Sequence, residues 1–104
     1  MHFDSKEAAA EVKAAEKRIR PYIRRTPLEP SLYFDKLTGG NIHLKLENMQ
    51  HSGSFKLRGA LNKILSLNEK EKSLGLMTAS SGNHGAAFSW AAKKFGLNGI
   101  ICVP

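Results

Sequence analysis

The stretch KLENMQHSGSFKLRGA, from Lys45 to Ala60, decides how the rest of this chain folds. It leaves an alternating segment at residues 42–47, turns through polar residues around Gly53, and enters a helical pattern that carries Lys56 in its first turn. Apolar residues three and four positions apart indicate the helix: Leu57, Ala60, Leu61, Ile64 and Leu65. The sequence therefore predicts a strand, a tight turn and an amphipathic helix in succession.

Lys56 lies at the edge of the apolar stripe of this helix, close to its N-terminus. The first N–H groups of a helix are unpaired and its dipole is positive there, which disfavours an ammonium ion. A neutral amine is what a lysine needs in order to bond to a carbonyl group. A lysine at this position can also extend its amine into water over a packed stem, and the spacing alone favours that second interpretation.

A second motif, TASSGNHG at residues 78–85, follows the SGSFKLRGA of residues 52–60. In this order the two resemble the cofactor-lysine motif and the asparagine loop of the fold-type-II pyridoxal-phosphate enzymes, in the branch of threonine dehydratase (ammonia-lyase) and serine racemase. The resemblance covers nearly the whole chain, from RRTPLEPS at 24–31 to NGIICVP at 98–104. Threonine synthases usually carry an aspartate directly after the lysine; Leu57 in that place favours the dehydratase and racemase branch.

The resemblance implies pyridoxal 5'-phosphate as the cofactor and gives roles to individual residues. Lys56 would carry the cofactor covalently, Phe55 would pack beneath its ring, and Asn83 would hydrogen-bond the ring's phenolic oxygen. The substrate carboxylate would be bound by backbone N–H groups and hydroxyls at a helix N-terminus, contributed by Ser80, Ser81, Gly82, Asn83 and His84. Serine, glycine and asparagine are also the residues of an ordinary capped turn between strand and helix.

Lys56 and Ser81 are the catalytic residues that the resemblance implies. Lys56 would remove the α-proton of the substrate, and Ser81 corresponds to the serine that acts on the opposite face in racemases. A serine also occurs at that position in some dehydratases, so Ser81 does not decide between the two activities.

The function implied by the resemblance is β-elimination from threonine or serine, which gives a 2-oxo acid and ammonia. The alternatives are a serine-racemase-type enzyme and a catalytically silent fragment of either. We expect the chain to be an N-terminal fragment, because the family's phosphate loop and ring-nitrogen partner would lie beyond Pro104. The parent is expected to be a cytoplasmic homo-oligomer that acts on a small amino acid and binds neither nucleic acid nor membrane.

The fold class expected is α/β, with open parallel sheets and flanking helices; the resemblance makes it a truncated fold of the tryptophan-synthase-β type. Successive strand–helix–strand units predict parallel pairing. The predicted helices cover residues 4–20, 32–37, 56–65 and 86–95, the predicted strands 42–47, 74–79 and 100–103, and residues 68–73 form a charged connection. By resemblance, residues 1–74 open the larger catalytic domain and residues 75–104 the smaller one, both incomplete.

Composition excludes several other classes of function. The chain has 104 residues and a net charge of +7, but acidic residues interrupt its basic cluster and no aromatic platform for bases accompanies it. The four histidines show no metal-ligand spacing, so no metal site is expected. Cys102 is the only cysteine, which rules out an internal disulfide, and its apolar neighbours predict that it is buried in a strand covered on both faces.

Overall fold

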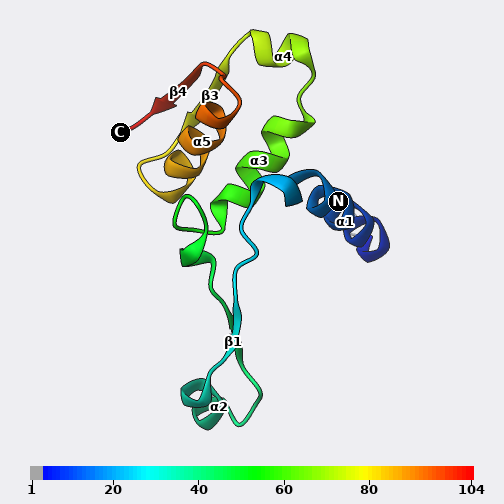
Figure 1. Ribbon diagram of the computed structural model, residues 1–104, viewed down its shortest axis with the longest axis vertical. Helices are drawn as coiled ribbons and strands as arrows, with labels where there is room; N and C mark the ends of the chain where they lie inside the picture. The colour runs from blue at the N-terminus through cyan, green and yellow to red at the C-terminus, as the bar shows by residue number, and fades with distance from the viewer. Residues whose placement is uncertain (1–3) are drawn as a thin grey trace.

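The computed structural model describes residues 4–104 and is drawn in Figure 1. Its elements are α1 (Ser5–Ile19), the 3-10 turn η1 (Arg20–Tyr22), β1 (Leu28–Pro30), α2 (Leu32–Thr38), β2 (His43–Lys45), the 3-10 turn η2 (Glu47–Met49), α3 (Lys56–Ser66), α4 (Glu69–Ser73), β3 (Leu76–Ala79), α5 (Asn83–Lys94) and β4 (Gly99–Cys102). The α/β class is confirmed, and the predicted helix that begins with Lys56 is α3.

Helix α1 begins and ends where its local chemistry directs, whereas α3 forms along its apolar stripe. The Asp4 carboxylate caps α1 by accepting from the Lys6 and Glu7 N–H groups at 2.8 and 3.4 Å. Pro21 lies just past its end, in η1, because proline cannot continue the helical hydrogen bonds. Residues 56–66 form the predicted helix, α3, with the apolar stripe turned inward.

The segment 68–73, which the sequence predicted as a connection, contains the short helix α4 instead. Asn68 Oδ1 accepts from the Glu71 N–H at 2.9 Å, and Glu71 Oε2 accepts from the Asn68 N–H at 2.8 Å. This reciprocal capping box satisfies two N–H groups that a helix start leaves unpaired. The prediction was wrong because this helix has no apolar face, and its cap is its only local signal.

The hydrophobic core joins three helices. Its buried side chains come from the end of α1 and the residues after it, from one face of α3 and from one face of α5: Ile19, Ile23, Leu57, Ala60, Leu61, Ile64, Ala87 and Ala91. Figure 1 shows α3 and α5 lying side by side. The alanines of α5 are small, so the two helices approach closely, and their positions are fixed relative to each other.

The last two strands form the parallel unit that the sequence predicted. Leu76 pairs with Gly99 and Ala79 with Cys102, and α5 makes the connection between them. Gly99 is needed in this unit because the Phe88 ring lies directly over it. A Cβ at position 99 would be 2.8 Å from a ring carbon of Phe88.

The strand at 43–45 does not join that sheet, so the expectation of parallel pairing is wrong for it. It pairs antiparallel with β1, with Leu28 opposite Lys45 and Pro30 opposite His43. Helix α2 ends at Gly39, whose φ of 71° turns the chain back on itself, so β2 returns alongside β1. The result is an arm that extends away from the helical core, with α2 at its tip (Figure 1).

Strand β4 was expected to be covered on both faces, and Cys102 to be buried; both expectations are wrong for the described residues. Ile100 is 60% exposed and Cys102 is exposed. One face of the sheet rests on α5, whereas no element within residues 4–104 covers the other. Apolar sequence alone does not reveal whether a covering layer is present.

Candidate active site

Lys56 is the first residue of α3 and its side chain is exposed. Directly after it, Leu57 is completely buried and anchors the first turn of the helix in the core. The Lys56 ammonium nitrogen lies 5.3 Å from the centroid of the Phe55 ring, which is itself exposed. The chain therefore presents an accessible amine beside an aromatic face on a firmly packed helix start.

The turn before Lys56 is held at its first residue by Gln50, which is 3% exposed. The Gln50 side chain accepts from the Arg24 N–H at 2.9 Å and donates to the Arg24 carbonyl at 3.0 Å. Inside the turn, the Gly53 N–H donates to the Gln50 carbonyl at 2.9 Å, and φ at Gly53 is 76°. Glycine adopts this left-handed conformation without the strain that a side chain would add.

On the other side of Lys56, Arg58 makes a two-pronged ion pair with Glu47. Its Nε and Nη2 donate to the two carboxylate oxygens at 2.9 and 2.8 Å, and the Thr26 hydroxyl donates to Glu47 Oε1 at 2.6 Å. The hydrogen bonds from Arg58 are the main reason that the pKa of Glu47 falls to about 2, against an opposing effect of burial. Glu47 is therefore a fixed negative charge at any physiological pH.

The asparagine loop lies between β3 and α5. Ser80 Oγ accepts from the Gly82 and Gly85 N–H groups at 3.2 and 2.9 Å, so this hydroxyl acts as a cap for α5. Helix α5 begins at Asn83, three residues earlier than the sequence predicted, which places Asn83 and His84 in its first turn. Ser81 and Asn83 are both exposed, and the first N–H groups of the helix are directed toward the same loop.

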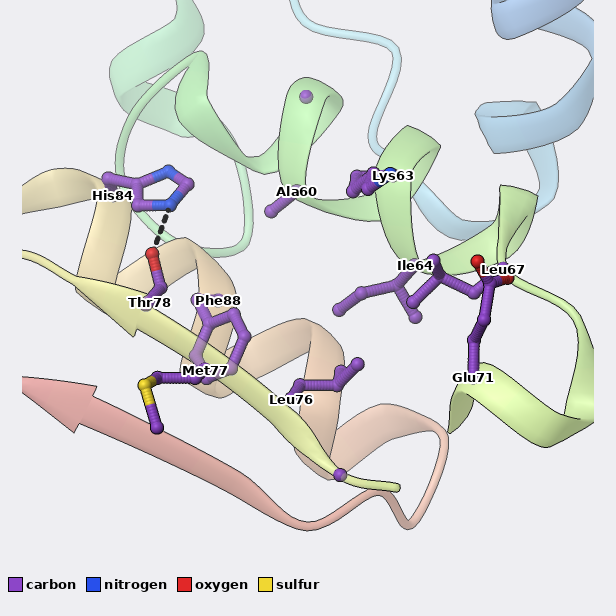
Figure 2. Close-up of a pocket in the computed structure, with 12 residues that line it drawn as sticks. Ala60, Lys63, Ile64, Leu67, Glu71, Leu76, Met77, Thr78, His84 and Phe88 are labelled. Atoms are coloured by element: carbon purple, nitrogen blue, oxygen red, sulfur yellow. Dashed lines mark hydrogen bonds between the residues drawn. The ribbon is translucent and has the colours of Figure 1, made fainter. Parts of the chain in front are cut away.

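The His84 ring points away from this loop. Its Nε2 lies 2.9 Å from the Thr78 hydroxyl, and the ring lines a cavity of about 330 Å³ between α3, α4, β3 and α5 (Figure 2). The N–H group of His84 stays available to the loop, but its ring does not. Neither Lys56 nor Asn83 lines the cavity, so it is separate from the site that the two motifs define.

The structure brings the two motifs to the same end of one helix pair. Helices α3 and α5 run side by side in the same direction, and each begins with one of the two residues, Lys56 or Asn83 (Figure 1). Shared core packing through Leu57, Leu61 and Ala87 keeps these helix starts in register.

The residues present suit pyridoxal phosphate. An exposed primary amine, an exposed aromatic ring and an exposed amide are the groups that the cofactor's aldehyde, ring and phenolic oxygen require. In addition, the Ser52 hydroxyl is buried beside the turn and has no hydrogen-bond partner within residues 4–104. Buried polar atoms without a hydrogen-bond partner are rare in native proteins, and this one is consistent with a polar ligand nearby.

Metal-binding clusters and membrane-spanning helices are both absent from residues 4–104. These residues contain no cluster of three or more histidine, cysteine or carboxylate side chains that could hold a metal ion. Within the same part of the chain, no helix is both long and apolar enough to cross a membrane.

Sequence reasoning missed the polar and aromatic contacts that surround Lys56. Glu47 and Arg58 are eleven positions apart, and the Trp90 ring, on which the His51 ring stacks, lies outside both motifs, so no local spacing rule joins either pair. The only available signal was that Glu47, His51 and Arg58 lie within the stretch 45–60.

Residues 19–104 match the family model described as pyridoxal-phosphate dependent enzyme. A catabolic L-threonine dehydratase of Staphylococcus aureus is 46% identical over 95 residues, which are 90% of this chain and 28% of that protein. The chain therefore spans about 28% of the length of the curated relatives it matches.

Solved structures give the same grouping. The serine racemase of Dictyostelium discoideum is 45% identical, with a TM-score of 0.86 over 91% of this chain and 31% of that one. A pyridoxal 5'-phosphate-dependent aspartate racemase is 44% identical, with a TM-score of 0.82 over 92% of this chain and 31% of that one. The resemblance inferred from the two motifs is confirmed at the level of the family and its fold.

His51 follows Gln50 in the turn before Lys56. Its ring stacks on the Trp90 ring of α5, with centroids 4.8 Å apart and planes at 14°. The side chain of His51 is exposed, but partial desolvation, followed by the positive charges of Arg24 and Lys94, lowers its pKa. Because the folded state resists protonation more than the unfolded state, this contact stabilises the fold above the ordinary histidine pKa of about 6.5. The stabilisation is lost as the pH falls through the lowered pKa of His51.

We therefore expect wild type to melt at a higher temperature than His51→Asn at about pH 7.5, with a difference that shrinks toward about pH 5. Calorimetry of the whole protein at several pH values measures this difference. His43→Asn, on the exposed strand β2, serves as the matched control and should retain the full wild-type dependence. A difference that stays constant or grows as the pH falls would contradict the prediction.

Proposed function

The chain belongs to the family of pyridoxal-phosphate dependent enzymes, and from this premise we propose that the whole protein is an ammonia-lyase that acts on threonine or serine. The observation that carries the proposal is the 46% identity to a threonine dehydratase over 90% of the chain. The family match at residues 19–104 spans both Lys56 and Asn83. On the resemblance alone, the proposal extends to a homo-oligomer that works in the cytoplasm.

Three residues would hold the cofactor: Lys56 through its amine, Phe55 beneath the ring, and Asn83 at the phenolic oxygen. The substrate carboxylate would lie against the loop at residues 80–84, where the start of α5 offers N–H donors and a positive dipole. Ser80 would contribute indirectly, because its hydroxyl already caps the helix. Ser81 is the hydroxyl of this loop that remains exposed.

When bound, pyridoxal phosphate withdraws electrons from the α-carbon of an attached amino acid and makes its proton acidic. Once the substrate amine has displaced Lys56 from the cofactor, the freed Lys56 amine would take that proton as a general base. Loss of the β-hydroxyl as water, followed by hydrolysis, converts threonine or serine into a 2-oxo acid and ammonia. The loop at residues 80–84 would hold the carboxylate so that the α-proton faces Lys56.

Racemisation is the second candidate activity, and the 45% identity to a serine racemase supports it. In that reaction the Ser81 hydroxyl would move a proton on the face opposite Lys56. Because a pyridoxal 5'-phosphate-dependent aspartate racemase is 44% identical to this chain, aspartate is a further candidate substrate. A catalytically silent chain remains the third candidate.

The proposal also divides the chain into two domains, with residues 1–74 opening the larger one and residues 75–104 the smaller one. Two observations support this boundary. The β1–β2 pair and the β3–β4 pair are separate sheets, and α4 with its capping box lies between them.

Labelling of Lys56 tests the proposed function most simply. Reduction of the cofactor-loaded whole protein with borohydride should leave a stable pyridoxyl group on Lys56, located by mass spectrometry of the digested protein. Lys56→Arg should abolish the label, whereas Lys63→Arg, one exposed lysine further along the same helix, should retain it. A label on any other lysine would reject the assignment.

Asn83 and Ser81 should separate cofactor binding from proton transfer. Asn83→Ala removes a hydrogen bond to a charged or partly charged oxygen, worth roughly 1.5–3 kcal/mol. We expect looser cofactor, an altered visible absorbance and a turnover lower by about ten- to a hundredfold.

Ser81→Ala should leave the visible absorbance unchanged and, in a racemase, abolish racemisation while sparing much of the elimination. Absorbance spectra and assays of both reactions on the whole protein measure these effects. If Asn83→Ala changed neither absorbance nor turnover, the loop would be only a helix cap.

A further inference from the structure

Glu47 is a nearly buried carboxylate on which three segments of the chain converge. Thr26 reaches it from the segment after η1, Glu47 itself follows β2, and Arg58 comes from the first turn of α3. The Glu47 side chain is 13% exposed and that of Arg58 is 29% exposed. Removal of either partner would leave the other as a poorly solvated charge, so this contact is held strongly.

The geometry of the pair restrains orientation as well as distance. Two parallel N–H···O bonds fix the plane of the Arg58 guanidinium against the carboxylate, which a single contact would not do. The Thr26 hydroxyl restrains the same carboxylate from a third direction at 2.6 Å. Thr26 is buried, and Lys45 Nζ donates to its carbonyl at 2.5 Å, so Thr26 is itself held in place.

Along the chain, Lys56 lies between Gln50, whose side chain binds the Arg24 backbone, and Arg58, which pairs with Glu47. Gln50 fixes the residue at which the turn begins, and Arg58 fixes the helix two residues after Lys56. Within the turn, the Lys56 N–H contact to Ser54 Oγ is long, at 3.4 Å. Leu57 packs this turn into the core, and these two anchors further restrain the direction in which the Lys56 side chain projects from the helix.

We propose that Glu47 and Arg58 are positioning residues that orient the first turn of α3, so that the Lys56 amine is presented toward the start of α5. This inference rests on the proposed function, in which Lys56 carries the cofactor. Neither residue touches the cofactor or the substrate in this role. Catalytic amines need a narrowly defined direction of approach, and misplacement by about 1 Å can slow a reaction on the order of a hundredfold.

The alternative is that the pair only stabilises the fold, and the two roles differ in what they do to neighbouring lysines. Loosening of the whole helix would change the reactivity of Lys56 and of Lys63, which is exposed two turns further along α3. Loss of orientation at the first turn would change the reactivity of Lys56 alone. The ratio of labelling at these two lysines, measured in one sample, therefore separates the roles.

The experiment adds pyridoxal phosphate to the cofactor-free whole protein and traps the product with cyanoborohydride over time. Mass spectrometry then gives separate rates for Lys56 and Lys63. Glu47→Gln keeps the shape but removes the charge, and Arg58→Lys keeps the charge but removes the planar fork. We expect each to slow labelling of Lys56 at least tenfold relative to Lys63. Thr26→Val, which spares the ion pair, should slow it about two- to fivefold.

Glu69→Gln is the matched control, because it breaks the Lys72–Glu69 pair, in which Glu69 is 91% exposed. It should leave both rates unchanged. Calorimetry shows which variants are folded, and if Glu47→Gln is not, Arg58→Lys and Thr26→Val decide the matter. An unchanged ratio in the folded variants overturns the proposal, as does equal slowing at both lysines. If wild type takes no label on Lys56, the proposed function fails instead.

Discussion

The burial of Leu57 and Leu61 between α3 and α5 is the contact on which the rest of this structure depends. Both side chains are completely buried, and each contributes roughly 1.5–3 kcal/mol by leaving water. Because Ala87 and Ala91 face them, the two helices approach closely. Lys56 and Asn83 begin these helices, so the same packing that forms the core also fixes the separation between the two candidate site residues.

Polar contacts restrain the first turn of α3, whose position the core has set. The core settles where α3 lies, but it does not determine the direction of an exposed side chain at the first helical residue. Glu47 with Arg58 on one side, and Gln50 with the Arg24 backbone on the other, restrain that turn. The stack of His51 on Trp90 ties the beginning of the same turn to α5. Hydrophobic contacts thus set the position of α3, and polar contacts restrain the direction of its first turn.

The parts of the fold that sequence could predict are those with a local cause. The stripe from Leu57 to Ile64 predicts α3, and the apolar runs around Thr78 and Ile101 predict β3 and β4. The antiparallel return of β2 was missed because it depends on the turn at Gly39 and on β1, which is only three residues long. The candidate site residues came from two motifs, whereas the Glu47–Arg58 pair joins residues that become neighbours only in the folded chain.

We propose that Lys56 and Asn83 serve one cofactor, and a structure of the whole protein after borohydride reduction with pyridoxal phosphate tests this proposal directly. We expect a pyridoxyl group on Lys56 whose phenolic oxygen lies about 3 Å from the Asn83 amide nitrogen. A pyridoxyl group on another lysine, or one on Lys56 with the Asn83 amide directed elsewhere, would contradict it.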